Sequence, residues 1–121
     1  MTIEYSIEVD DSLLRVKAWG QDDDLQGVLN YGQALLAAAV EHKCLKVLCD
    51  ERALVYKIAT LDIYESAKLM AELAPSQAQV AIVFNPEFSA DAKFWETVAV
   101  NRGLKVSFFK DMDEAEAWLD V

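Results

Sequence analysis

A chain of 121 residues, 54% of them hydrophobic, is long enough and apolar enough to bury a core, which excludes an intrinsically disordered protein. Its net charge of −10 repels nucleic-acid phosphates and anionic lipid headgroups, so we expect neither as a partner. The apolar runs are too short to span a membrane and no signal peptide precedes them, so we expect one cytoplasmic domain over residues 1–121.

The first two segments alternate apolar and polar side chains, which is the period of a half-buried strand. The alternation covers residues 3–9 and resumes over residues 14–18. Asp10 and Asp11 between the two runs are typical of a tight turn, and Gly20 ends the second run. The sequence therefore predicts a β-hairpin.

Three aspartates at residues 22–24 then precede a predicted helix over residues 25–40, where carboxylates suit the unpaired N–H groups and the helix dipole. The expected inward positions are Leu25, Val28, Leu29, Gly32, Leu35, Leu36, Ala39 and Val40. His42 follows at the C-terminal end, where a cation complements the dipole. We interpret this single histidine as a helix-end residue rather than a catalyst.

A short apolar strand is predicted over residues 45–49, with Asp50, Glu51 and Arg52 at its carboxyl end. Sites in open α/β sheets gather beyond the carboxyl ends of parallel strands. Asp50 and Arg52 there form either an ion pair that holds the following loop or an anchor for a polar ligand.

The segment over residues 51–59 is predicted to be a loop of mixed character. Its apolar residues, among them Leu54, Tyr56 and Ile58, cannot all point inward from an irregular segment. They form either an exposed apolar patch that marks a partner or ligand site, or a cover over the end of the core. The residues alone leave both alternatives open.

The remaining segments continue to alternate between helix and strand. We expect a helix over residues 60–73 capped by Thr60, a strand over 80–84, a helix capped by Ser89 with Phe94 inward and Gly103 after its end, a strand over 104–109, and a helix capped by Asp111 with Trp118 inward. The order ββαβαβαβα predicts an α/β fold with a mixed, mostly parallel five-stranded sheet and four helices.

Catalytic signatures are missing from this sequence. It has no glycine-rich phosphate loop, no nucleophile elbow and no Cys-x-x-Cys pair, and a single histidine limits any catalytic triad or zinc site. Cys44 and Cys49 are interpreted as reduced core residues. We therefore expect no metal, no cofactor and no enzymatic activity.

Three stretches, residues 47–52 (Val-Leu-Cys-Asp-Glu-Arg), 94–103 and 108–119, resemble the SpoIIAA-like proteins. These belong to the wider STAS domain group and are related in fold to the anti-sigma factor antagonists. The resemblance covers essentially the whole chain. It implies a non-enzymatic regulatory domain that docks a protein partner through the end of the third strand and the helix that follows.

In the antagonists, a serine in an Asp-Ser-Ser-Gly motif at the start of that helix is phosphorylated by the partner kinase. Counted without gaps from Asp50, this serine falls on Thr60. Ile58, Ala59 and Leu61 stand where the motif has its aspartate, its other serine and its glycine. Thr60 is therefore either a plain N-cap or a phosphosite, and a phosphate there would meet the helix dipole.

The SpoIIAA-like group is also similar to the lipid-binding CRAL-TRIO fold, which implies a small apolar ligand as the alternative to a protein partner. A homodimer is a third kind of assembly that the sequence leaves open. The predicted binding or partner surface comprises Asp50, Glu51, Arg52, Leu54, Tyr56, Ile58 and Thr60. A closed apolar cavity beneath Leu54, Tyr56 and Ile58 would favour the ligand, and a solid core there would exclude it.

Overall fold

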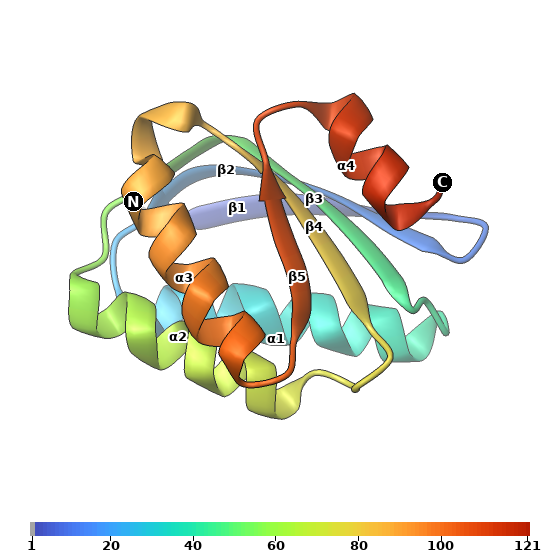
Figure 1. Cartoon of the computed structure of the whole chain (residues 1–121), viewed down its shortest axis with the longest axis horizontal. Helices are drawn as coiled ribbons and strands as arrows, with labels where there is room; N and C mark the ends of the chain where they lie inside the picture. The colour runs from blue at the N-terminus through green and yellow to red at the C-terminus, as the bar shows by residue number, and fades with distance from the viewer. Residues whose placement is uncertain (1) are drawn as a thin grey trace.

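The strands of the computed structural model, which describes residues 2–121, form one five-stranded sheet. The elements are β1 (Ile3–Asp10), β2 (Leu13–Asp22), α1 (Leu25–Glu41), β3 (Lys46–Tyr56), α2 (Thr60–Leu73), β4 (Gln79–Phe84), η1 (Pro86–Phe88), α3 (Ser89–Asn101), β5 (Lys105–Phe109) and α4 (Met112–Leu119). The sheet order is β1-β2-β3-β4-β5, with β1 antiparallel to β2 and the later pairs parallel (Figure 1). The predicted ββαβαβαβα fold and mostly parallel sheet are confirmed.

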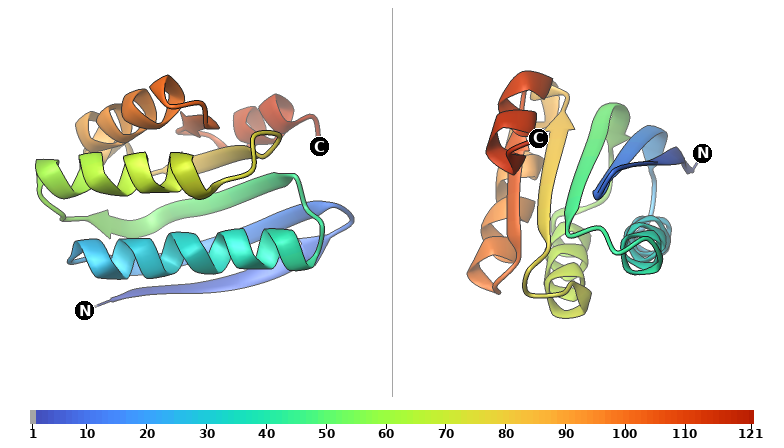
Figure 2. Two further views of the ribbon diagram at one scale, coloured as in Figure 1. Left: turned by 90° about the horizontal axis from the view of Figure 1, so that it is seen from below. Right: turned by 90° about the vertical axis from the view of Figure 1, so that its right-hand side faces the viewer.

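The helices divide unequally between the two faces of the sheet. α1, α2 and α3 cover one face with α2 in the middle, and α4 covers the other (Figure 1, Figure 2). Successive side chains of β2 contribute to the core on both faces of the sheet, because Leu14 and Val16 face the three helices whereas Leu13 faces α4. None of the described helices is long and apolar enough to cross a membrane.

Two glycines fit positions that other residues fill badly. Gly20 has φ +94°, and a Cβ there would lie 2.3 Å from the carbonyl oxygen of Thr2, because the β1 backbone approaches β2 closely. Gly103 has φ +99° directly after α3, which is the left-handed position predicted for it. Gly20 thus permits the close approach of β1 within β2, which continues to Asp22 rather than ending at Gly20 as predicted, and Gly103 permits the turn after α3.

The predicted loop over residues 51–59 is wrong for residues 51–56, since β3 continues to Tyr56, and only residues 57–59 form a loop. The pairing of β2 with β3 shifts from Lys17 opposite Asp50 to Trp19 opposite Ala53, so β3 contains one extra residue. The extra residue interrupts the alternation of apolar side chains, which is why the pattern suggested an irregular segment. After the shift, Leu54 faces the three-helix side, as Cys49 does before it.

Two predicted N-caps are also wrong. Thr60 is the first residue of α2 rather than its cap, and Ala59 precedes it with no side-chain hydrogen bond to the helix. Ser89 begins α3, and its Oγ donates to the carbonyl of Pro86, 2.6 Å away, because η1 runs directly into the helix. The cap at Asp111 is confirmed, with its Oδ1 accepting from two backbone N–H groups.

Three residues predicted to face inward lie at the surface. Val40 is 66% exposed, and Phe94 and Trp118 are each 37% exposed. Val40 is in the last turn of α1, where its neighbour Ala39 is buried instead. Periodicity locates the buried stripe of a helix, but residues at the edge of that stripe can be buried or exposed.

Candidate functional site

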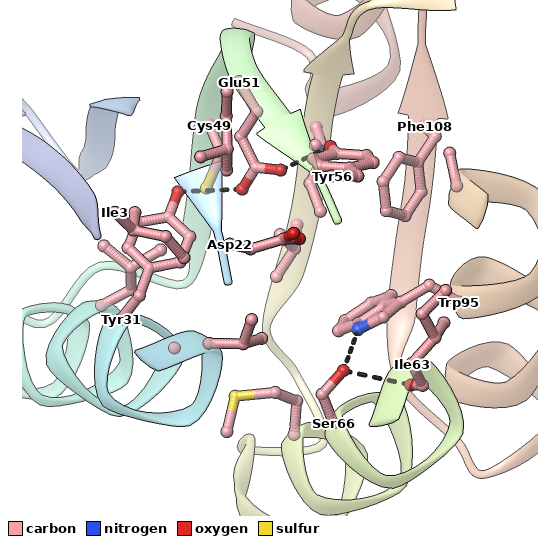
Figure 3. Close-up of a pocket in the computed structure, with 18 of the residues that line it drawn as sticks. Ile3, Asp22, Tyr31, Cys49, Glu51, Tyr56, Ile63, Ser66, Trp95 and Phe108 are labelled. Carbon is pink, nitrogen blue, oxygen red and sulfur yellow. Dashed lines mark hydrogen bonds between the residues drawn. The ribbon is translucent and has the colours of Figure 1, made fainter. Parts of the chain in front are cut away.

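A cavity of about 130 Å³ lies between the sheet and the three helices α1, α2 and α3 (Figure 3). Most of its walls are aliphatic or aromatic. The apolar lining includes Ile3, Tyr31, Leu35, Val47, Leu54, Tyr56, Ile58, Ile63, Met70, Ile82, Trp95 and Phe108. A cavity of about 150 Å³ with walls of this kind is large enough to bind benzene. The packing therefore leaves room for a small molecule.

One carboxylate lies in the cavity wall between two tyrosines. Glu51, which is only 7% exposed, accepts from the hydroxyl of Tyr31 at 2.9 Å and from that of Tyr56 at 2.6 Å (Figure 3). Burial raises the pKa of Glu51, and the two hydroxyl groups oppose that shift by stabilising its charged form. Burial, with the charge of Glu51 next, raises the pKa values of both tyrosines well above the usual range.

A second carboxylate, Asp22, lies at the end of β2 and also lines the cavity. Its Oδ1 accepts from the backbone N–H groups of Lys57 and Ile58, and the bond from Ile58 is 3.2 Å long. Burial raises the pKa of Asp22 to about 6, with further repulsion from Asp91 and Asp23. At neutral pH, Asp22 is therefore mostly charged but gains a proton readily.

The α2–α3 side of the cavity carries a neutral polar pair. The Oγ of Ser66, fully buried on α2, accepts from Nε1 of Trp95 at 2.8 Å and donates to the carbonyl of Ile63 at 3.0 Å. This arrangement uses the hydrogen-bonding capacity of both side chains and keeps the indole ring of Trp95 against the cavity (Figure 3). The pair is thus a fixed part of the wall.

The whole arrangement of strands and helices matches two solved structures. An anti-sigma factor antagonist from Mycobacterium paratuberculosis is similar with a TM-score of 0.68 and 15% identity, over 99% of this chain and 96% of the other. The fold is SpoIIAA-like. An uncharacterised protein from the DUF3478 family with a SpoIIAA-like fold, from Shewanella loihica PV-4, matches with a TM-score of 0.57 and 20% identity, over 98% and 94% of the two chains.

Comparison of the sequence alone finds no matching family model and no matching curated protein. The predicted resemblance in fold to the anti-sigma factor antagonists and the SpoIIAA-like proteins is confirmed over nearly the full length. At these identities the likeness concerns the fold. The chemistry of the site in this SpoIIAA-like domain therefore has to be argued from its own residues.

The predicted site residues fall into three groups in the structure. Glu51, Leu54, Tyr56 and Ile58 line the cavity, so the apolar residues of this segment cover the end of the core. Asp50 and Arg52 instead form a two-pronged ion pair with contacts of 2.9 and 2.8 Å. Hydrogen bonding from Arg52 lowers the pKa of Asp50. Thr60 lies apart from both groups, exposed at the start of α2.

Sequence reasoning missed several residues of the cavity. Asp22 was grouped with its neighbours as helix-capping residues, whereas Asp24 alone is the N-cap of α1, with its Oδ1 accepting from Gly27 at 2.7 Å. Tyr31 was left out of the inward stripe of α1, although it is 7% exposed. A helix needs one N-cap residue, so the presence of three aspartates was the signal that one of them could have another role. Among residues 2–121, no cluster of His, Cys, Asp or Glu could hold a metal ion.

Proposed function

We propose that this chain is a ligand-binding domain whose cavity takes a small, largely apolar molecule. The observation that carries the proposal is the cavity of about 130 Å³ beneath Leu54, Tyr56 and Ile58. The cavity is partly open to solvent rather than closed, and the side chains that line it lack dispersion contacts on that side. A bound ligand of matching size would restore those contacts.

The register shift in β3 supports the same proposal. It directs Cys49 and Leu54 to one face, although they are five positions apart and regular alternation would place them on opposite faces. Glu51 and Tyr56 join the same wall through their hydrogen bond. Such irregularities are frequent beside binding sites, where they redirect side chains.

Toluene is a suitable first probe because it is close to benzene in size and carries no charge. Toluene should raise the thermal unfolding temperature of the wild type as its concentration increases. It should also shift the NMR signals of residues in the cavity wall. Ala92→Leu, which places a larger side chain in the cavity wall, should abolish both effects. Ala90→Leu is the matched control, because Ala90 is exposed on the same helix.

Toluene shifts that persist in the Ala92→Leu protein would place binding elsewhere and contradict the proposal. So would a wild type that shows no response to the probe. Native mass spectrometry of the protein, purified gently from its own host, would then identify a natural small molecule by its mass.

A second candidate function is docking of a protein partner, as the fold of the anti-sigma factor antagonists suggests. The specific observation is an exposed apolar residue, Leu61 at 71% exposure, beside exposed Thr60 in the first turn of α2. If a partner protein binds there, Thr60→Glu should release it from this chain without unfolding the domain. Thr97→Glu, at an exposed position of α3, is the control. A complex that survives Thr60→Glu would argue against this surface.

A further inference from the structure

The charged side chains that line the cavity all have the same sign. Asp22, Glu51 and Asp91 lie among the described lining residues, and no lysine, arginine or histidine accompanies them. A carboxylate removed from water requires compensation by hydrogen bonds or by a positive charge. Here the compensation comes from hydrogen bonds alone, so the wall retains an uncompensated negative charge.

Hydrogen bonding satisfies the two inner carboxylates to different extents. Both oxygens of Glu51 accept from tyrosine hydroxyl groups, which are neutral donors. Asp22 is 7% exposed, yet only its Oδ1 accepts hydrogen bonds from the described residues, and its Oδ2 accepts none of them. Figure 3 shows Asp22 between the Glu51–tyrosine cluster and the Ser66–Trp95 pair, at the centre of the cavity lining. No fully buried side-chain oxygen among the described residues lacks a partner, so Oδ2 is reached by solvent and can accept from a donor that enters the cavity.

The remaining walls suit the body of an organic cation. Four aromatic rings, those of Tyr31, Tyr56, Trp95 and Phe108, line the same cavity. Aromatic faces attract ammonium groups, and the attraction is strongest where water is excluded. A bare metal ion would find too few free oxygen ligands in this apolar wall. An anionic ligand would face three carboxylates.

We propose that the cavity binds a small amphiphilic amine, with its ammonium group donating to Asp22 and near Glu51, and with an apolar body among the aromatic rings. This inference rests on the proposed ligand-binding function and specifies the class of ligand. One ammonium group supplies both a positive charge, which the lining lacks, and a donor that replaces water at Oδ2 of Asp22. The space limits the body to about the size of one benzene ring.

The test compares three probes of nearly equal shape: benzylamine, benzyl alcohol and toluene, each titrated into the wild-type protein by calorimetry and NMR. Benzylamine should bind at least about tenfold more tightly than benzyl alcohol, as a charge-assisted hydrogen bond predicts. Asp22→Asn should remove most of that preference and leave the affinity for toluene unchanged. Glu8→Gln, which removes an exposed carboxylate from β1, should retain the preference and controls for net charge.

The possible results separate the two proposals. If benzyl alcohol or toluene binds as tightly as benzylamine, the amine inference is overturned and the ligand-binding function stands. If none of the three binds, both are overturned. If Glu8→Gln weakens benzylamine as much as Asp22→Asn does, the preference comes from the overall charge of the protein, and the inference is again overturned. Where Asp22→Asn folds poorly, the wild type still decides: benzylamine-induced NMR shifts confined to the cavity wall support the inference, and shifts spread over the acidic surface overturn it.

Discussion

Replacing Asp22 by asparagine should stabilise the protein at neutral pH and leave its stability nearly unchanged at pH 4. The side-chain oxygen of asparagine can still accept from the N–H groups of Lys57 and Ile58, so the backbone connection is kept. What changes is the charge. The folded protein holds the proton on Asp22 more tightly than the unfolded chain does, because the pKa rises from 3.8 to about 6.

The sign and size of the effect follow from that shift. When folding raises the pKa of a carboxyl, the protein becomes less stable as the pH rises from the pKa of the unfolded state to that of the folded state. For Asp22 this range runs from about 4 to about 6. The full shift corresponds to about 3 kcal/mol. Screening by solvent reduces it, so we expect a gain of about 1–2 kcal/mol for Asp22→Asn at pH 7.5.

The groups that face Asp22 set the conditions of the assay. Asp23, Asp91 and Glu51 interact with it electrostatically, as does the hydroxyl of Tyr56. These four groups are present in both the wild type and the Asp22→Asn protein. The difference in the free energy of unfolding between the two proteins therefore reports the charge of Asp22, together with the repulsion between that charge and these groups. Urea unfolding at pH 4 and pH 7.5 measures that difference, with Glu8→Gln as a control expected within about 0.5 kcal/mol of the wild type. A variant less stable than the wild type at pH 7.5, or a gain of equal size at both values, would refute the reasoning.

Three further substitutions test other parts of the site by urea unfolding. Tyr56→Phe removes a donor from the buried carboxylate of Glu51 and should cost about 1–3 kcal/mol, and an unchanged midpoint would show that this hydrogen bond does not stabilise the fold. Ser66→Ala leaves the indole N–H of Trp95 without an acceptor and should also cost about 1–3 kcal/mol, with a change in tryptophan fluorescence. Arg52→Gln, at a side chain 52% exposed, should cost less than about 1 kcal/mol and lose its effect at high salt or once Asp50 is protonated; a larger loss would mean that the pair does more than bridge the surface.

The fold could be predicted from the sequence because most elements have a regular period. The hairpin and α1 each show one, β4 is a continuous apolar run, and Gly103 and Asp111 mark ends that the structure confirms. The site could be predicted only in part. Leu54, Tyr56 and Ile58 were placed near a cavity, but the strand that contains Leu54 and Tyr56 was taken for a loop, since one extra residue breaks the alternation.

The polar part of the cavity lay beyond local patterns. Tyr31 and Glu51 are 20 residues apart in the chain, and Asp22 binds N–H groups 35 and 36 residues further on. Each of these residues has an ordinary local interpretation: a helix tyrosine, a charged residue after a strand, an acid before a helix. Only the three-dimensional packing of α1 and of the β2–β3 pair brings them together.

The extra residue in β3 reconciles an odd spacing in the sequence with a single wall in the structure. Glu51 and Leu54 are three positions apart, so regular alternation would place them on opposite faces of the sheet, whereas the irregular pairing places both on the three-helix side. Deleting one residue between them would leave them two positions apart, and regular alternation would then keep both on that side. Among proteins with this fold, a gap of one position here in an alignment would thus predict a regular strand that presents the same wall.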